Sequence, residues 1–157
     1  SARVLWEAGY LEQKQQARFY TRSGLLTAEH RGDWIELDFP AEPEEQTIPP
    51  RDLARALGVT LLREIPARGV IVTSLTSTQG YDFVSRFFAP GVGVNEDPVT
   101  GSAHCCLGPF WKDRINKSEF VAYQASERGG VVRVRLSGKR VYLGGNAVTI
   151  LRGELES

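Results

Sequence analysis

Methionine is absent from this chain of 157 residues, and cysteine occurs only twice. Cys105 and Cys106 are adjacent, so they cannot easily bridge each other or form the disulfide framework of a small secreted domain. We therefore expect reduced thiols and a cytoplasmic setting. The first eleven residues already have a helical pattern with no cap before them, which predicts that part of the protein precedes this sequence.

Long apolar runs and an excess of charge of one sign are also absent. No apolar run approaches the length of a membrane-spanning helix, and the first residues lack the zones of a signal peptide. Nineteen basic residues balance nineteen acidic ones, without the long runs of like charge that bind nucleic acid or anionic lipid. The hydrophobic fraction of 41% is sufficient for a sizeable core. We expect a globular protein with a small-molecule partner, and neither a nucleic-acid nor a membrane partner.

The first half of the chain predicts one helix and one hairpin. Residues 1–11 place four apolar side chains on one helical face, namely Val4, Leu5, Ala8 and Leu11. Residues 18–39 alternate in polarity around a turn at residues 31–33, as antiparallel strands do. Residues 41–50 are rich in proline and in acidic or amide side chains, which indicates an exposed linker at a domain boundary.

The second half predicts mainly strands, together with a helix that follows a long loop. The expected elements are a short helix at residues 52–57, strands at 69–75 and 81–88, strands from 120 onward with a turn at 137–139, and a last strand at 147–154. The longer helix follows residues 89–101 and presents four side chains on one face, namely Ala103, Cys106, Leu107 and Phe110. Pro109 should kink or shorten it by removing a backbone donor.

A faint repeat relates the two halves of the chain. Residues 20–23 (YTRS) and 123–126 (YQAS) each follow an expected helix and lead into an expected hairpin, with an offset of 103 residues. A repeat of that length is typical of two similar domains, whereas solenoids repeat at much shorter periods. The sequence therefore predicts an α+β protein with two lobes.

Residues 97–102 combine a stiffened carboxylate with the start of a helix. Pro98 restricts the backbone of Asp97 to extended angles, which fixes the direction of the carboxylate. Thr100, Gly101 and Ser102 then begin the helix, where backbone N–H groups lack partners and the helix dipole favours an anion. A small carboxylate could bind these amides, and donors facing its oxygens would ease removal of the adjacent C–H proton. We predict proton transfer as the reaction class.

A purely structural interpretation fits the spacing of these residues equally well. Thr100 or Ser102 could cap the helix, and Asp97 could begin a turn. The longer string around them favours a site, because residues 85–90 (SRFFAP) and 96–104 (EDPVTGSAH) closely resemble the signature of PhzF-like proteins. Further similarity at residues 20–26 (YTRSGLL), 37–40 (LDFP) and 123–130 (YQASERGG) extends this resemblance over most of the chain.

The resemblance implies a diaminopimelate-epimerase-like α+β fold with two pseudo-symmetric lobes, each a mixed sheet wrapped around a central helix. Residues 1–45 would be the remainder of an incomplete first lobe and residues 46–157 the second lobe, whose last strand is a candidate to complete the first. Carried over by motif, Asp97 and Ser102 would be catalytic, and Thr100 and Gly101 would bind substrate. The family includes a cofactor-independent isomerase of phenazine biosynthesis, and relatives often form homodimers.

Two departures from the family pattern affect this interpretation. Members usually begin well before the residue that matches Ser1, and the preceding stretch carries the glutamate taken as the proton-transferring base and a histidine. The segment at residues 59–65 is also short, because the family has an extra strand and helix there. A chain that begins at Ser1 would be inactive alone, since proton transfer needs an acid and a base held on the substrate.

Weaker signals favour structural roles. His104, Cys105 and Cys106 lack the spacing and the second cluster of a zinc site, so we expect no metal and assign the cysteines to the core. We expect His30 on an exposed hairpin, and a basic stripe on a solvated surface, formed by Arg133, Arg135, Lys139 and Arg140.

The leading hypothesis is a cofactor-independent isomerase or epimerase that moves a proton on a small amino or hydroxy acid in the cleft between two lobes. The alternative is a protein on the same scaffold that binds a small carboxylate without catalysis.

Overall fold

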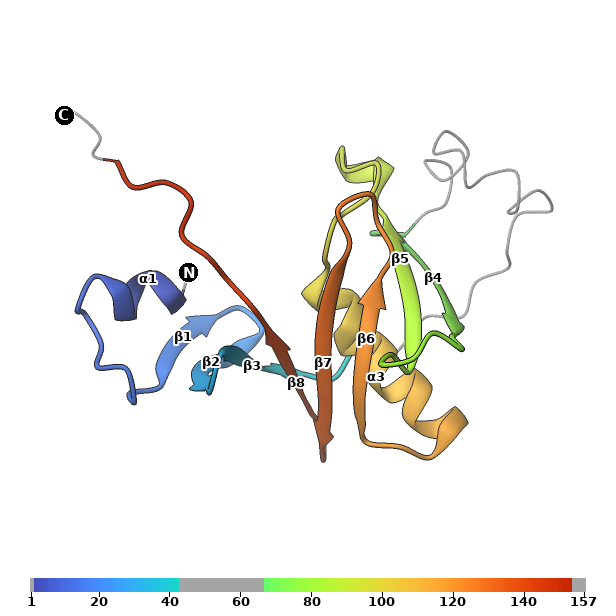
Figure 1. The fold of residues 1–157 in the computed structure, drawn as a ribbon, viewed down its shortest axis with the longest axis horizontal. Coiled ribbons are helices and arrows are strands. Elements are labelled where there is room, and N and C mark those ends of the chain that lie inside the picture. The colour runs from blue at the N-terminus through green and yellow to red at the C-terminus, as the bar shows by residue number, and fades with distance from the viewer. Residues whose placement is uncertain (1, 43–66, 154–157) are drawn as a thin grey trace.

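The computed structural model describes residues 2–42 and 67–153, whose strands form one mixed sheet (Figure 1). The strand order is β1-β2-β3-β8-β7-β6-β5-β4, and all neighbours are antiparallel except the parallel pair β5 and β6. The strands are β1 (Ala17–Thr21), β2 (Gly24–Arg31), β3 (Trp34–Pro40), β4 (Val70–Leu75), β5 (Phe83–Phe88), β6 (Glu119–Gln124), β7 (Gly130–Ser137) and β8 (Arg140–Gly145). The helices are α1 (Ala2–Glu7), the 3-10 turn η2 (Pro90–Val92) and α3 (Gly101–Ile115).

The alternating polarity of the sequence correctly predicts the turns at residues 31–33 and 137–139 of this α+β fold. Residues 18–39 form three strands and not the predicted pair, because a further turn at residues 22–23 separates β1 from β2. Gly32 and Gly138 occupy the predicted turns with φ angles of 62° and 57°, a region that favours glycine. On β7, Val132 and Val134 are buried, whereas Arg133 points to the opposite face. The repeated segments at residues 20–23 and 123–126 each lie where one strand ends and a hairpin partner follows. The repeat therefore corresponds to two similar strand arrangements within one continuous sheet.

Helix α3 packs on one face of the sheet and continues past Pro109 to Ile115. The expectation that this proline shortens the helix is wrong. Pro109 cannot donate to the carbonyl of Cys105 four residues before it, but the backbone N–H of Glu42 donates to that oxygen instead at 3.3 Å. The chain leaving β3 therefore supplies the donor that the proline removes. Asn116 ends the helix in the left-handed region, with φ of 50°.

The main hydrophobic core lies between α3 and strands β5 to β8. Its buried members are Phe83, Cys105, Leu107, Trp111, Phe120, Ala122, Val132, Val134, Val141 and Leu143. Phe83 is central, because its ring lies 5.7 Å from that of Trp111 and 5.8 Å from that of Phe120, measured between centroids. This core holds α3 at a fixed place on the sheet.

A second, smaller core joins α1 to strands β1 and β2. The fully buried residues of α1 are Ala2 and Trp6. The predicted apolar face is partly correct, because Leu5 and Leu11 pack against this core, whereas Val4 and Ala8 are exposed. His30 packs against Trp6 at 4.2 Å between ring centroids and is half-buried, which corrects its expected exposure.

The segment after β8 is not the strand predicted at residues 147–154. Residues 146–153 have no strand assignment, and Val148, Ile150 and Leu151 are 76%, 92% and 85% exposed. The segment is tied to α1 by Glu7, whose Oε2 accepts hydrogen bonds from Thr149 (2.6 Å) and Arg152 (3.2 Å). These bonds and the charge of Arg3 lower the pKa of the Glu7 carboxyl.

Several sequence predictions concern residues outside the described ranges. These are the linker over residues 43–50, the helix over 52–57 and the short segment over 59–65. The division into lobes at residues 45 and 46 stays a prediction. Within residues 2–42 and 67–153, no helix has the length and apolarity needed to cross a membrane.

Leu107 offers a test of the α3 core. We expect Leu107→Ala to lower the free energy of unfolding by about 2–5 kcal/mol, because it leaves a cavity between α3 and the sheet. Leu151→Ala removes the same atoms from an exposed position and should change it by less than about 0.5 kcal/mol. Urea unfolding of both variants measures the difference, and equal losses would contradict this packing.

Candidate functional site

The loop from β5 to α3 is held by backbone and ionic contacts. The N–H of Asp97 donates to the carbonyl of Phe87 at 3.0 Å, which ties the loop to the end of β5. Arg86 donates two hydrogen bonds to the carboxylate of Glu96, at 2.7 and 2.8 Å, in the bidentate geometry that guanidinium groups favour. This partner raises the pKa of Arg86. Residues 96 and 97 are therefore positioned by β5 rather than by the helix.

Gln124, at the end of β6, joins this loop to the centre of the sheet. Its side chain is fully buried, and its Oε1 accepts the backbone N–H of Thr100 at 2.9 Å. Its Nε2 donates to the carbonyl of Asp97 at 2.6 Å and to the hydroxyl of Thr100 at 3.1 Å. All polar atoms of this buried amide are thus satisfied by the predicted site loop, as buried polar groups require.

Thr100 is the N-cap residue of α3, but its side chain does not cap the helix. The hydroxyl donates instead to Oδ2 of Asp97, at 2.5 Å. The capping interpretation of Thr100 is therefore wrong. Because the hydroxyl is directed to Asp97, no side chain covers the first helical amides in the way that a capping residue would.

The turn after β6 packs against the same loop. Ser126 donates to the carbonyl of Pro98 at 2.8 Å and accepts the N–H of Gly129 at 3.0 Å. A Cβ atom at Gly130 would lie 2.2 Å from Cγ2 of Val99, so only glycine permits this approach. The β6–β7 turn and the loop before α3 therefore form one packed unit.

A cavity of about 750 Å³ opens beside the start of α3. Its walls come from β3, the loop before α3, β7, β8 and the segment after β8, including Trp34, Leu37, Val99, Gly101, Leu143 and Ala147. Gly101 is exposed, and a Cβ atom added there would meet only Leu143, at 3.7 Å. Of the four predicted site residues, only Gly101 is among the residues that line this cavity. Asp97 and Ser102 are half-buried, and Thr100 is buried.

His104 lies one helical turn after Thr100 and is fully buried. Its Nδ1 is 2.7 Å from the carbonyl of Thr100, which can only accept, so Nδ1 carries the hydrogen. Nε2 has no hydrogen-bond partner among the described residues, and the ring stacks on Phe83 at 6.2 Å between centroids. Burial lowers the pKa of His104, because a charged ring here would lose its hydration. The neutral histidine is a structural member of the core.

The cysteines follow in the same helix. Burial raises the pKa of the Cys105 thiol to about 12, so it stays protonated and is a poor nucleophile at neutral pH. Cys106 is half-buried. In the part of the chain that the structure describes, no group of three or more histidine, cysteine or acidic side chains is placed to hold a metal.

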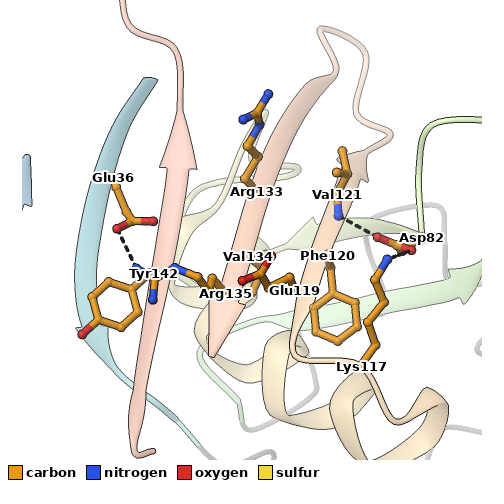
Figure 2. A pocket seen from close by; sticks show the side chains of 10 residues that line it. All are labelled: Glu36, Asp82, Lys117, Glu119, Phe120, Val121, Arg133, Val134, Arg135 and Tyr142. Atoms are coloured by element: carbon orange, nitrogen blue, oxygen red, sulfur yellow. Dashed lines mark hydrogen bonds and ion pairs between the residues drawn. The ribbon is translucent and has the colours of Figure 1, made fainter. Parts of the chain in front are cut away.

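A second cavity, of about 410 Å³, lies on the face of the sheet opposite α3 (Figure 2). Four of its six charged side chains form two ion pairs: Arg135 donates to Glu36 at 2.7 Å, and Lys117 donates to Asp82 at 2.5 Å, whereas Glu119 and Arg133 carry opposite charges. The Glu36 carboxylate raises the pKa of Arg135. The cavity therefore presents little unbalanced charge to a ligand.

The predicted basic stripe is solvated only in part, because three of its side chains contact residues of neighbouring strands, whereas Lys139 is exposed. Arg133 lies over the ring of Trp34 at 4.0 Å, and Arg135 lies over Tyr142 at the same distance. Arg140 binds the carboxylate of Asp38 at 2.7 Å. These side chains hold β7 and β8 to the neighbouring strand β3.

The arrangement of strands around α3 defines a class of protein, the diaminopimelate-epimerase-like α+β fold. The model of the family described as phenazine biosynthesis-like protein (PhzC-PhzF) matches residues 52–153. The chain belongs to this family. The resemblance found in the sequence motifs is therefore confirmed.

Relatives across bacteria and mammals support this assignment. A protein of Halalkalibacterium halodurans named as an uncharacterized isomerase is 48% identical over 99% of this chain and 70% of its own length. Its alignment covers 185 positions and so exceeds the 157 residues of this chain. A human phenazine biosynthesis-like domain-containing protein is 33% identical over 87% of this chain and 64% of its own length.

Solved structures of the family have the same fold. The crystal structure of a PhzF family protein from Enterococcus faecalis superposes with a TM-score of 0.87 at 31% identity, covering 99% of this chain and 70% of that one. A putative PhzC/PhzF protein from Clostridium difficile gives a TM-score of 0.81 at 28% identity, with 98% and 70% coverage. The isomerase names among the relatives support isomerase activity as the general function.

The buried His104 predicts how stability depends on pH. Its pKa is lowered in the folded state, so below about pH 6.5 the unfolded chain binds a proton that the native chain does not. Its contribution to stability is present above about pH 6.5 and is lost as the pH falls toward the lowered native pKa, by up to about 1.4 kcal/mol per pH unit. Urea unfolding between pH 7.5 and 5 should show this slope, and His104→Gln should reduce it. An unchanged slope in the variant would contradict the assignment.

Proposed function

We propose that the protein is a cofactor-independent isomerase or epimerase that moves a proton on a small amino or hydroxy acid. The observation that carries this proposal is the open N-terminus of α3. Gly101 exposes the helix start to the 750 Å³ cavity, and the Asp97 carboxylate is hydrogen-bonded to Thr100, the N-cap residue of the same helix. A cavity of that volume suits a small ligand.

The first amides of α3 suit the carboxylate of such a ligand. Backbone N–H groups in the first turn of a helix have no intrahelical acceptor, and the helix dipole places partial positive charge there. Exposed Gly101 permits close approach, and half-buried Ser102 brings a hydroxyl to the same turn. A substrate carboxylate bound to these donors would be oriented with its adjacent carbon toward the cavity.

The helix amides favour proton transfer because they lie where negative charge develops on the substrate during the reaction. When a base removes the C–H proton next to the carboxylate, the electron pair spreads onto the carboxylate oxygens, where the helix amides stabilise it. The proton returns to the same carbon from the other face or to another carbon, which completes an epimerisation or an isomerisation. Asp97 is the acid or base on this side, and a second group completes the pair. The glutamate implied by the family resemblance is the candidate for that group.

The wider setting of the protein stays a prediction. We infer a small organic acid as its partner, a cytoplasmic location and a homodimer, all from the sequence and the family resemblance. The alternative function, carboxylate binding without catalysis, uses the same helix terminus. Measurements of turnover and of binding separate these two functions.

Asp97 is the first test of the proposed chemistry. In the full-length protein, which includes the preceding stretch with the implied glutamate, we expect Asp97→Asn to lower turnover at least about 100-fold, because the amide cannot exchange the proton as a carboxylate does. Turnover is measured as deuterium incorporation from solvent into candidate 2-amino and 2-hydroxy acids. Asp113→Asn, at an exposed position of α3, is the matched control and should retain activity. Equal rates in Asp97→Asn and wild type would exclude Asp97 as the acid or base.

Gly101 tests binding independently of catalysis. Gly101→Ala should preserve the fold, because its Cβ would make only an ordinary contact with Leu143, but it should obstruct a ligand at the helix amides. We expect the Kd for a substrate-like carboxylate to rise by about tenfold or more, which corresponds to about 1.4 kcal/mol. Calorimetric titration measures it.

Gly91→Ala is the matched control for this binding test. An added Cβ has open space at this exposed glycine, which lies outside the cavity lining. Its Kd should equal that of wild type. Retained affinity in Gly101→Ala would place the carboxylate elsewhere, whereas binding without deuterium exchange in wild type would favour the non-catalytic function.

A further inference from the structure

The buried amide of Gln124, the buried hydroxyl of Thr100 and the half-buried carboxylate of Asp97 form a hydrogen-bond chain with a fixed direction. The backbone N–H of Thr100 can only donate, so the Gln124 atom that it contacts at 2.9 Å must be the amide oxygen. The other end of the amide is therefore the NH₂ group, which can only donate. One of its hydrogens goes to the carbonyl of Asp97 and the other to the hydroxyl oxygen of Thr100.

This arrangement leaves the single Thr100 hydroxyl hydrogen with one direction. The hydroxyl oxygen accepts from Gln124, so its hydrogen is free for the carboxylate of Asp97, which can only accept. The hydrogen bond ends on Oδ2. Within residues 2–42 and 67–153, no hydrogen-bond donor contacts the other carboxylate oxygen, Oδ1. The two oxygens of Asp97 therefore have different surroundings.

We propose that Gln124 and Thr100 are positioning residues that hold Oδ2 of Asp97 and leave Oδ1 as the oxygen that exchanges a proton with the substrate. This inference rests on the proposed function. It also gives Thr100 a different role from direct substrate binding, since its amide and its hydroxyl are both engaged within the protein.

The hydrogen-bond chain from Gln124 through Thr100 to Asp97, called the relay below, is mostly buried, which explains why it can fix the orientation of the Asp97 carboxylate. Thr100 is 7% exposed and Gln124 is fully buried, so water does not compete well for their hydrogen bonds. Gln124 is anchored on β6, which pairs in parallel with β5 at the register Ser85 to Gln124. The Asp97 carboxylate is thus oriented by the sheet, whereas the backbone amides proposed to bind the substrate belong to α3. A small error in this orientation can cost a large factor in rate.

The test separates positioning from stability by comparing two substitutions at one residue. Thr100→Val keeps the shape and removes the hydroxyl, whereas Thr100→Ser keeps the hydroxyl. We expect Thr100→Val to lower kcat about 10- to 100-fold with KM changed by less than about threefold, and Thr100→Ser to restore most of that loss. Rates are divided by the folded fraction from circular dichroism. Thr27→Val, at a residue 9% exposed in β2, is the matched control and should retain kcat.

Three kinetic results would overturn the proposal. These are an unchanged kcat in Thr100→Val, a loss carried by KM alone, and equal losses of kcat in the serine and valine variants. The last result would indicate a packing role, because serine keeps the donor and loses only a methyl group. In contrast, a loss of kcat in Thr100→Val that is largely absent in Thr100→Ser would support the relay.

A second measurement does not depend on activity. The side-chain amide signals of Gln124 in a ¹H–¹⁵N spectrum should respond to Asp97→Asn in the wild-type background and respond much less in the Thr100→Val background, since the hydroxyl transmits the change. Equal responses in both backgrounds would overturn the relay. If the full-length wild-type protein exchanges no deuterium into any acid tested, the proposed function fails, and this spectrum still decides whether the three residues are coupled.

Discussion

The hydrogen bonds of Gln124 are the constraint on which the rest of the candidate site depends. One buried amide on β6 holds both ends of the segment from Asp97 to Thr100, so the loop before α3 takes its shape from the sheet. The hydroxyl of Thr100 is consequently directed to Asp97 and does not cap the helix. The same bonds therefore orient the carboxylate and leave the helix start open to the cavity.

Sequence patterns predicted the paired strands well because side chains alternate with a period of two wherever one face is buried. They failed at residues 147–154, because an apolar pattern cannot specify a partner strand, and residues 146–153 have none in the described sheet. The face predicted for α1 was only partly correct, since Leu5 and Leu11 pack against the smaller core but Val4 and Ala8 are exposed. A single Trp6 outweighs several smaller apolar side chains in so short a helix, and periodicity alone does not weigh their sizes.

The site was only partly visible in the sequence. Asp97 and Gly101 could be selected because a proline and a helix start lie beside them in the chain. Gln124 occurred in the repeat and in a family string but was given no role, since it acts across 24 to 27 residues and meets the loop through the parallel pairing of β5 and β6. The signal that could have identified it is an amide at a strand position that should be buried, where a partner is required.

Pro109 has a consequence for the dimensions of the cavity. The carbonyl that it leaves free on Cys105 binds the N–H of Glu42, just beyond β3, and β3 contributes Trp34 and Leu37 to the wall facing the start of α3. Two elements that line the cavity are thereby joined through main-chain atoms, which side-chain replacements leave in place. Exchanging a side chain of the lining would accordingly alter the surface offered to a ligand without breaking the link between the helix and the strand.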